Sequence, residues 1–172
     1  MKTVLLIPVG NIEGDVIEEI RKAIEEAFSF KAKVGENSRI PEKAFNLRRR
    51  QYHSTSIIEE LGRLKDRYDL ALGITDVDLY VPQLNFVFGE ADVLRGVALI
   101  SLTRLREEFY RARPDHKLFI ERAIKEAIHE IGHLCGLDHC QDRRCIMFFS
   151  NSIRDTDIKG PGFCRYCKEI LG

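Results

Sequence analysis

The sequence predicts an α/β fold, in which a twisted, mostly parallel mixed sheet is flanked by helices and followed by a small C-terminal subdomain. Short apolar runs typical of buried strands alternate with longer segments whose apolar residues recur at helical spacing. A length of 172 residues suits one domain with a small appendage. We therefore expect a main domain over residues 1–139 and a subdomain over 140–172, which is too small to fold without a metal ion.

The first elements are predicted to be a strand, a helix and a second strand. The apolar run Thr3–Val9 is bounded by glycine and is typical of a buried strand. Asp15–Phe28 carries apolar residues at helical spacing, with Asp15 as its candidate N-cap. Lys31–Val34 resembles a second strand, and the polar, irregular stretch 35–53 is interpreted as a loop.

The middle of the chain is predicted to contain one further helix and three further strands. Ser54–Leu64 has helical periodicity, with Ser54 or Ser56 as candidate cap. The three strands are expected at Asp69–Ile74, Leu84–Phe88 and Gly96–Leu102. A long charged connection then leads to the last helix of the main domain.

That helix is predicted over Asp115–Cys135, and its two faces differ. One face is apolar, through Ile120, Ala123, Ile124, Ala127, Ile131, Leu134 and Cys135. His129 and His133 fall on the opposite face, together with Arg122 and Glu126. A histidine that merely filled the core would lie in the apolar stripe, so we interpret both as metal ligands facing a cleft.

Residues 129–139 read H-E-I-G-H-L-C-G-L-D-H, which has the spacing of a catalytic zinc site. His129 and His133 are four residues apart and point in nearly the same direction on a helix. Glu130 lies about 100° around the helix, beside the metal, where a carboxylate can accept a proton from water. Gly136 permits a left-handed turn that returns the chain and delivers His139 as a third ligand. Three protein ligands leave one position open, as catalytic zinc requires.

Four of the five cysteines form two pairs after this motif, Cys140 with Cys145 and Cys164 with Cys167. The pairs favour a tetrahedral four-cysteine zinc site, with disulfides or free thiols as alternatives. Metal binding is preferred because we expect a cytoplasmic, reducing location: the apolar run at the N-terminus is too short for the core of a signal peptide. Cys135 is left over on the apolar helix face and is interpreted as a small buried hydrophobe.

The charge balance argues against a polyanionic or membrane partner. Lys and Arg number 27, as do Asp and Glu, so no basic excess recruits nucleic acid or an anionic membrane. The run Arg48–Arg50 is accordingly interpreted as part of a solvated loop. No stretch approaches the roughly 18 apolar residues of a membrane span.

The pattern H-E-x-x-H-x-x-G-x-x-H, followed by a methionine, resembles that of the metzincin zinc peptidases. The methionine is Met147, and the cysteines around it make the chain similar to the archaemetzincin family, whose members carry a second zinc on four cysteines. The resemblance implies a metzincin-like domain with an active-site helix and two Zn²⁺ ions per chain. It also implies these roles: catalytic zinc on His129, His133 and His139, general base Glu130, structural support Met147, and structural zinc on Cys140, Cys145, Cys164 and Cys167. Phe149 stands where some metzincins have a tyrosine, so no tyrosine is expected to stabilise the transition state there.

We therefore expect a zinc-dependent metallopeptidase, a hydrolase acting on peptide or protein substrates, with a substrate laid along the strand at Leu84–Phe88. One alternative is a zinc-stabilised peptide-binding module with little or no turnover, which would have no need of Glu130. Another is a nucleic-acid contact on the cysteine subdomain through Lys159, Arg165 and Lys168, which the absence of a basic excess disfavours.

Overall fold

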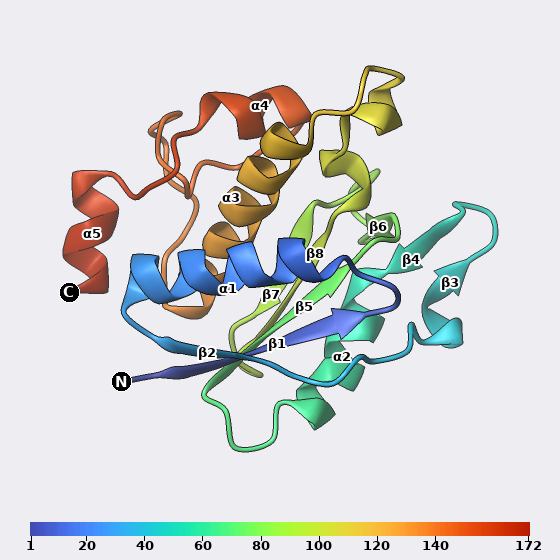
Figure 1. Ribbon diagram of the computed structural model, residues 1–172, viewed down its shortest axis with the longest axis horizontal. Coiled ribbons are helices and arrows are strands. Elements are labelled where there is room, and N and C mark those ends of the chain that lie inside the picture. Colours follow the sequence, from blue (N-terminus) through green and yellow to red (C-terminus); the bar gives the residue numbers. More distant parts are fainter.

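A computed structural model describes all residues, 1–172, and has the expected α/β architecture. Its main sheet has five strands in the order β2-β1-β5-β8-β7 (Figure 1). Neighbouring strands are parallel except that β7 runs antiparallel to β8. The strand bounds are β1 Thr3–Val9, β2 Lys31–Val34, β5 Leu70–Thr75, β7 Gly89–Asp92 and β8 Val97–Ser101. Four of these lie within one residue of the predicted strands. Three of the four, β1, β5 and β8, are buried on both faces of the sheet and are correspondingly apolar, whereas β2 is largely exposed at the edge of the sheet.

Helices cover the sheet on both sides and create two cores. Helices α1 (Gly14–Phe28) and α3 (His116–Leu134) pack on one face, where 19 buried apolar residues form the larger core (Figure 1). Helix α2 (Ser54–Leu64) packs on the other face around a core of 11 buried residues. The sheet is therefore the middle of three layers, and its strand ends position the loops around α3.

The stretch predicted as an irregular loop contains a small second sheet. Strands β3 (Phe45–Asn46), β4 (Gln51–His53) and β6 (Leu79–Tyr80) pair there, and a 3-10 turn, η1, spans Glu42–Ala44. Arg48 and Arg50 are exposed, as predicted for a solvated run, whereas Arg49 is partly buried and bonded to its neighbours. Its guanidinium donates to the carbonyl oxygens of Leu84 and Asn85 at 2.6 and 3.1 Å and lies 4.1 Å from the Tyr80 ring centroid.

The predicted strand at Leu84–Phe88 is wrong. In this segment only Val87 makes a β-bridge, to Leu79, and the edge strand β7 begins at Gly89. The reason lies in the backbone carbonyls of Leu84 and Asn85, which accept hydrogen bonds from side chains of the small sheet instead of from a neighbouring strand. The apolar character that suggested a strand serves packing, since Phe88 belongs to the larger core.

Both helix caps that the sequence predicted are wrong. Helix α3, predicted to begin at Asp115, begins at His116, and Asp115 is its N-cap, because its carboxylate accepts from the Leu118 backbone N–H at 3.0 Å. The N-cap of α1 is Glu13, however, and Asp15 lies inside the first turn. The N-cap of α2 is His53, and the Ser54 hydroxyl bonds instead to the Glu90 carboxylate of the edge strand.

The C-terminal segment packs on the side of α3 that faces away from the sheet. It contains α4 (Ile153–Ile158) and α5 (Arg165–Leu171). Two 3-10 turns outside this segment, η2 (Thr103–Leu105) and η3 (Glu107–Tyr110), precede α3. The contacts of the C-terminal segment with α3 form a third, smaller core of six buried residues: Ile128, Leu137, Cys145, Ile146, Met147 and Cys167. Thus α3 is buried on two sides, including much of the face that the sequence suggested was open.

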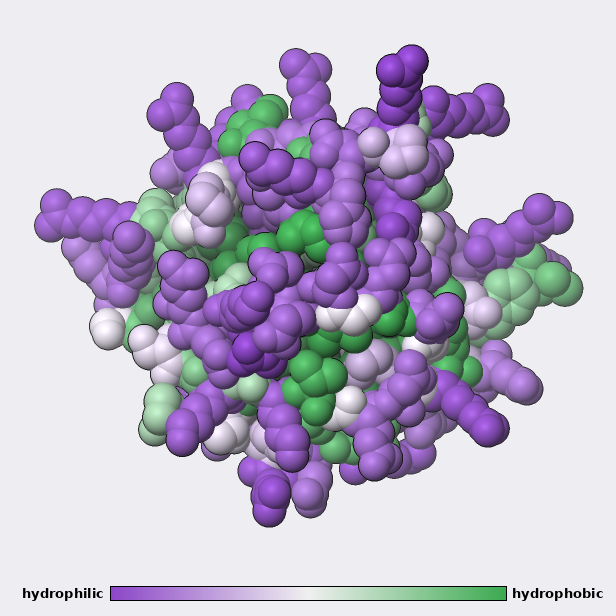
Figure 2. Space-filling view, in the orientation of Figure 1, coloured by the Kyte–Doolittle hydropathy of each residue, from purple (hydrophilic) through white to green (hydrophobic).

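The outer surface follows the composition. The face in Figure 2 is covered mainly by hydrophilic side chains, with small hydrophobic patches between them. No helix has both the length and the apolar content required to cross a bilayer.

Candidate active site

The three histidines of the motif converge at the C-terminal end of α3. The ring centroids of His129 and His133 are 4.6 Å apart, and that of His139 lies 5.3 and 4.7 Å from them. The helix ends at Leu134 with Cys135 as its C-cap, and Gly136 follows with a φ of +92°, which only glycine adopts without strain. This turn brings His139 back beside the helix, as the sequence predicted.

Two hydrogen bonds fix the rings of the helical histidines. His129 Nδ1 lies 2.8 Å from the Ile146 carbonyl oxygen and His133 Nδ1 lies 2.7 Å from that of Leu137. Since a carbonyl oxygen only accepts, both Nδ1 atoms carry the proton, and both Nε2 atoms present a lone pair. These Nε2 atoms are 3.1 Å apart.

That contact tests whether the residues fit a metal ion. Two lone pairs facing each other at 3.1 Å repel unless a cation lies between them. Nitrogen ligands about 2.05 Å from a shared tetrahedral zinc would be roughly 3.3 Å apart, close to this separation. One ligand atom from each of the three rings lies within 4.8 Å of the others. The donor set and its spacing therefore suit zinc.

The ring environment also favours the neutral form of imidazole that binds metals. Burial lowers the pKa of His129 well below its usual value, and the nearby Lys159 ammonium acts in the same direction. Burial likewise lowers the pKa values of His133 and His139. A neutral ring keeps its lone pair available for coordination.

Glu130 is buried beside the histidines, yet no group of the protein donates a hydrogen bond to its carboxylate. Burial raises its pKa well above the usual value, and the neighbouring carboxylate of Glu126 adds to the rise while Lys159 opposes it. The carboxylate lies against Gly89 of the edge strand, where an added Cβ would be 2.6 Å from Glu130 Oε1. A free acceptor is thus held next to the histidine cluster.

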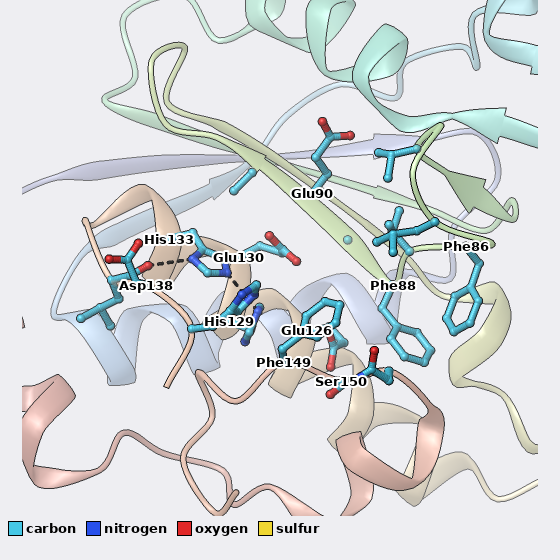
Figure 3. A pocket seen from close by; sticks show the side chains of 18 of the residues that line it. Phe86, Phe88, Glu90, Glu126, His129, Glu130, His133, Asp138, Phe149 and Ser150 are labelled. Carbon is cyan, nitrogen blue, oxygen red and sulfur yellow. Dashed lines mark hydrogen bonds between the residues drawn. The ribbon is translucent and has the colours of Figure 1, made fainter. Parts of the chain in front are cut away.

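A cleft of about 610 Å³ opens in front of these groups (Figure 3). One wall is α3, with Glu126, His129 and Glu130, and the other is the edge strand β7 with the segment that leads into it. Phe149 and Ser150 close the end next to Glu126. The segment Leu84–Phe88 does line this cleft, although it is not a strand.

Met147 lies fully buried behind the histidine helix. A Cβ added to Gly132, within the motif, would be 2.5 Å from the Met147 sulfur, so the glycine makes room for this side chain. Phe149 follows on the cleft side, where its ring centroid is 4.9 Å from that of His139. It supplies an aromatic wall and no hydroxyl.

The four predicted cysteines also come together. The sulfurs of Cys140 and Cys164 are 3.7 Å apart, as are those of Cys145 and Cys167. This separation is far longer than the roughly 2.05 Å of a disulfide but matches the roughly 3.8 Å between sulfurs that share a tetrahedral zinc. Backbone N–H groups of Asp142 and residue 164 donate to two of the sulfurs, as they do to thiolates.

The two clusters share one piece of backbone. The Cys140 N–H donates to the Met147 carbonyl oxygen at 2.9 Å, which closes the loop between them. The intervening Ile146 supplies the carbonyl that orients His129. Because His139 and Cys140 are consecutive, displacement of the cysteine segment acts directly on two of the three histidines.

Sequence reasoning missed a buried ion pair. Lys159 is fully buried and its Nζ lies 2.9 Å from Glu126 Oε1, so it is not the surface cation that a nucleic-acid contact would need. The Thr156 hydroxyl donates to the same oxygen at 3.2 Å. Arg165, from the same hypothesis, is paired with Glu169. The only feature of the sequence that pointed to this ion pair was Glu126, an acidic residue on the same helix face as the histidines.

Comparison with known proteins gives consistent matches. The model of peptidase family M54 matches residues 7–172. The archaemetzincin of Methanocaldococcus jannaschii is 44% identical over 95% of this chain and 89% of its own length. Among solved structures, the archaemetzincin of Methanopyrus kandleri superposes with a TM-score of 0.88 at 36% identity, covering 99% of this chain and 93% of that one. A zinc-dependent peptidase from Methanocorpusculum labreanum gives a TM-score of 0.90 at 27% identity, covering 98% and 100%.

Proposed function

We propose the roles of the site residues in this chain, which belongs to peptidase family M54, the archaemetzincins, and is a zinc metallopeptidase with peptide or protein substrates. His129, His133 and His139 hold the catalytic zinc. Glu130 is the general base that accepts a proton from the attacking water. The pair of lone-pair-bearing Nε2 atoms 3.1 Å apart is the observation that carries this proposal.

When bound, zinc supplies Lewis acidity, which makes water nucleophilic near neutral pH and polarises the scissile carbonyl. The chain orients its ligands through the Ile146 and Leu137 carbonyls, which fix the rings of His129 and His133. The three histidines would supply three protein donors to a zinc ion, which would leave one position for water or substrate, and the cleft borders all three.

Glu130 is suited to proton transfer by what surrounds it. Its carboxylate has no competing donor, lies one residue after a zinc ligand and is buried in the wall of the cleft. A base in this position accepts the proton of the attacking water and can pass it to the leaving amine, because both reacting groups occupy the same cleft.

A second zinc, structural in role, is proposed on Cys140, Cys145, Cys164 and Cys167. Four protein donors saturate a tetrahedral ion, so this site has no position for substrate. It stabilises the C-terminal subdomain, residues 140–172, which carries Met147 and the carbonyl that orients His129.

The test compares Glu130→Gln with wild type on a peptide library read by mass spectrometry, with zinc quantified in both. Glutamine keeps the shape of the side chain and removes the base. We expect turnover to fall by about 10²–10⁴-fold while zinc stays at two per chain. Glu121→Gln, an exposed change on the same helix, is the matched control and should retain full activity.

Two results would contradict the proposal. Equal activity of Glu130→Gln and wild type would remove Glu130 as the base. Wild type that binds peptides with full zinc content but cleaves none would favour the binding-module alternative instead.

A further inference from the structure

The end of the cleft next to the histidines is polar although it is buried. Glu126 lies one helical turn before His129 and is 3% exposed, and Ser150 closes the same end at 9% exposure (Figure 3). Neither is a candidate zinc ligand or base.

Ser150 is the first sign that this end binds a polar group. Its hydroxyl is buried and has no hydrogen-bond partner in the protein. Buried hydroxyls are nearly always paired, because an unpaired one loses its hydration without compensation. Since Ser150 lines the cleft, its missing partner is one that arrives in the cleft.

Glu126 offers an acceptor at the same place. Its Oε1 is occupied by the Thr156 hydroxyl and by the Lys159 ammonium, at 3.2 and 2.9 Å. Its other oxygen has no protein partner and is available from the cleft. The ammonium of Lys159 offsets the carboxylate charge, so this end of the cleft carries an acceptor without a net negative charge.

Aromatic side chains line the part of the cleft that leads to Glu126 and Ser150. Phe86 and Phe88 stand edge to face, with ring centroids 5.0 Å apart, on the wall opposite α3, and Phe149 flanks the histidines. Figure 3 shows Phe88, Phe149 and Ser150 grouped around Glu126. An entering side chain therefore needs an apolar stem as well as a polar end.

We propose that Glu126 and Ser150 determine specificity for a substrate residue next to the scissile bond that bears a primary carboxamide, glutamine in the first place. This inference rests on the proposed peptidase function. The amide NH₂ donates to the free oxygen of Glu126 and the amide oxygen accepts from the Ser150 hydroxyl. A basic end finds no net negative charge, because Lys159 already neutralises Glu126, an acidic end meets the Glu126 carboxylate, and an apolar end leaves both polar groups unpaired.

The test measures kcat/KM for peptides that differ only at one residue flanking the scissile bond, in one series before it and one after it. Each series contains glutamine, methionine, lysine and glutamate. We expect wild type to prefer glutamine to methionine by about tenfold in one series, because a site built to hydrogen-bond disfavours an analogue that cannot. The ratio of two substrates on one preparation is unaffected by partial zinc loading.

The variant Ser150→Ala should lower this glutamine-to-methionine ratio by about three- to tenfold, the loss of one neutral hydrogen bond. Asn11→Ala, which removes an exposed amide that does not line the cleft, is the control and should leave the ratio within about twofold. An unchanged ratio in Ser150→Ala, or a wild-type preference for methionine, lysine or glutamate in both series, would overturn this inference alone. Absence of cleavage of every peptide by zinc-loaded wild type would overturn the proposed peptidase function with it.

Discussion

The histidine cluster and the cysteine cluster are neighbours in the chain, but their surroundings differ. The three histidines lie against a cleft of about 610 Å³ and next to a carboxylate that has no hydrogen-bond donor. The four cysteines provide a fourth donor, and Cys145 and Cys167 are buried in the small core between α3 and the C-terminal segment. Two sets of side chains that could hold a metal ion thus present one open and one closed arrangement.

This difference indicates that the role of a metal site depends on the groups around its ligands as well as on the ligands themselves. An open coordination position is useful only beside a cleft and a base, and the histidines have both a cleft and the buried carboxylate of Glu130 beside them. A saturated sulfur site is useful for holding chain segments together, and here it holds the segment that supplies the carbonyl acceptor of His129. The closed cluster is therefore expected to support the open one, whereas the reverse dependence is weak.

Cys164→Ala tests this one-way dependence and should have the largest effect. Loss of one sulfur leaves the second zinc site incomplete and releases residues 140–172, which bury little apolar surface of their own. We expect a lower melting temperature, loss of the cysteine-bound zinc and reduced zinc at the histidines. Zinc per chain by mass spectrometry, with melting by circular dichroism, measures all three.

His133→Ala is the matched variant on the open side. It should lose one zinc and all activity, yet keep the cysteine-bound zinc and most of its thermal stability. Full occupancy of the histidine site in Cys164→Ala, or equal loss of stability in the two variants, would show that the clusters are independent.

Lys159→Met tests the second link between the regions. Lys159 comes from the chain between the two cysteine pairs, and its partner Glu126 comes from the histidine helix. Removal of one partner of a buried pair leaves an uncompensated charge, so we expect the free energy of unfolding to fall by about 3–5 kcal/mol. Denaturant unfolding measures this, with zinc content followed in parallel.

Two further variants show whether the loss of stability in Lys159→Met comes from the buried ion pair. Lys168→Met, which replaces an exposed lysine just after Cys167, should change the free energy of unfolding by less than about 0.5 kcal/mol. The double variant Glu126→Gln/Lys159→Met removes both charges and should recover more than half of the loss. If Lys159→Met were no less stable than Lys168→Met, the ion pair would not join the two regions.

Local signals in the sequence were enough for much of the fold. Thr3–Val9 and Lys31–Val34 were predicted with the bounds that the structure has. The first is an apolar run that ends at a glycine, and the second alternates lysine with apolar residues before Gly35. Ser54–Leu64 was likewise correct as a helix. The convergence of three histidines and of four cysteines followed from helical spacing and from pairs of residues close in sequence.

Features that depend on distant contacts could not be predicted. Strand β7 has the sequence Gly-Glu-Ala-Asp, which shows no apolar alternation, and it is a strand because it pairs with β8. The pair Glu126–Lys159 joins residues on separate elements, and lysine in a polar sequence gives no sign of burial. Gly89 likewise appears in the sequence only as a turn or strand boundary, although it borders the carboxylate of Glu130.

Gly89→Ala tests that last contact, between the edge strand and the open cluster. The added Cβ would lie 2.6 Å from Glu130 Oε1 and 2.8 Å from the Leu99 carbonyl oxygen, so the carboxylate or the strand must move. We expect kcat to fall by about 100-fold with zinc content unchanged, because misplacing a reacting group by about 1 Å has this effect. Gly62→Ala on α2, where the nearest atom is 3.5 Å away, should leave kcat as it is.

The double variant Gly89→Ala/Glu130→Gln separates two explanations of that loss. If Gly89 acts by leaving room for the base, its substitution should cost almost nothing further once the base is gone, since residues in one interaction are not additive. If the substitution acts by distorting the strand that faces the substrate, the two losses should multiply. Non-additivity would place the edge strand in the positioning of Glu130, a dependence for which the closed cysteine cluster has no counterpart.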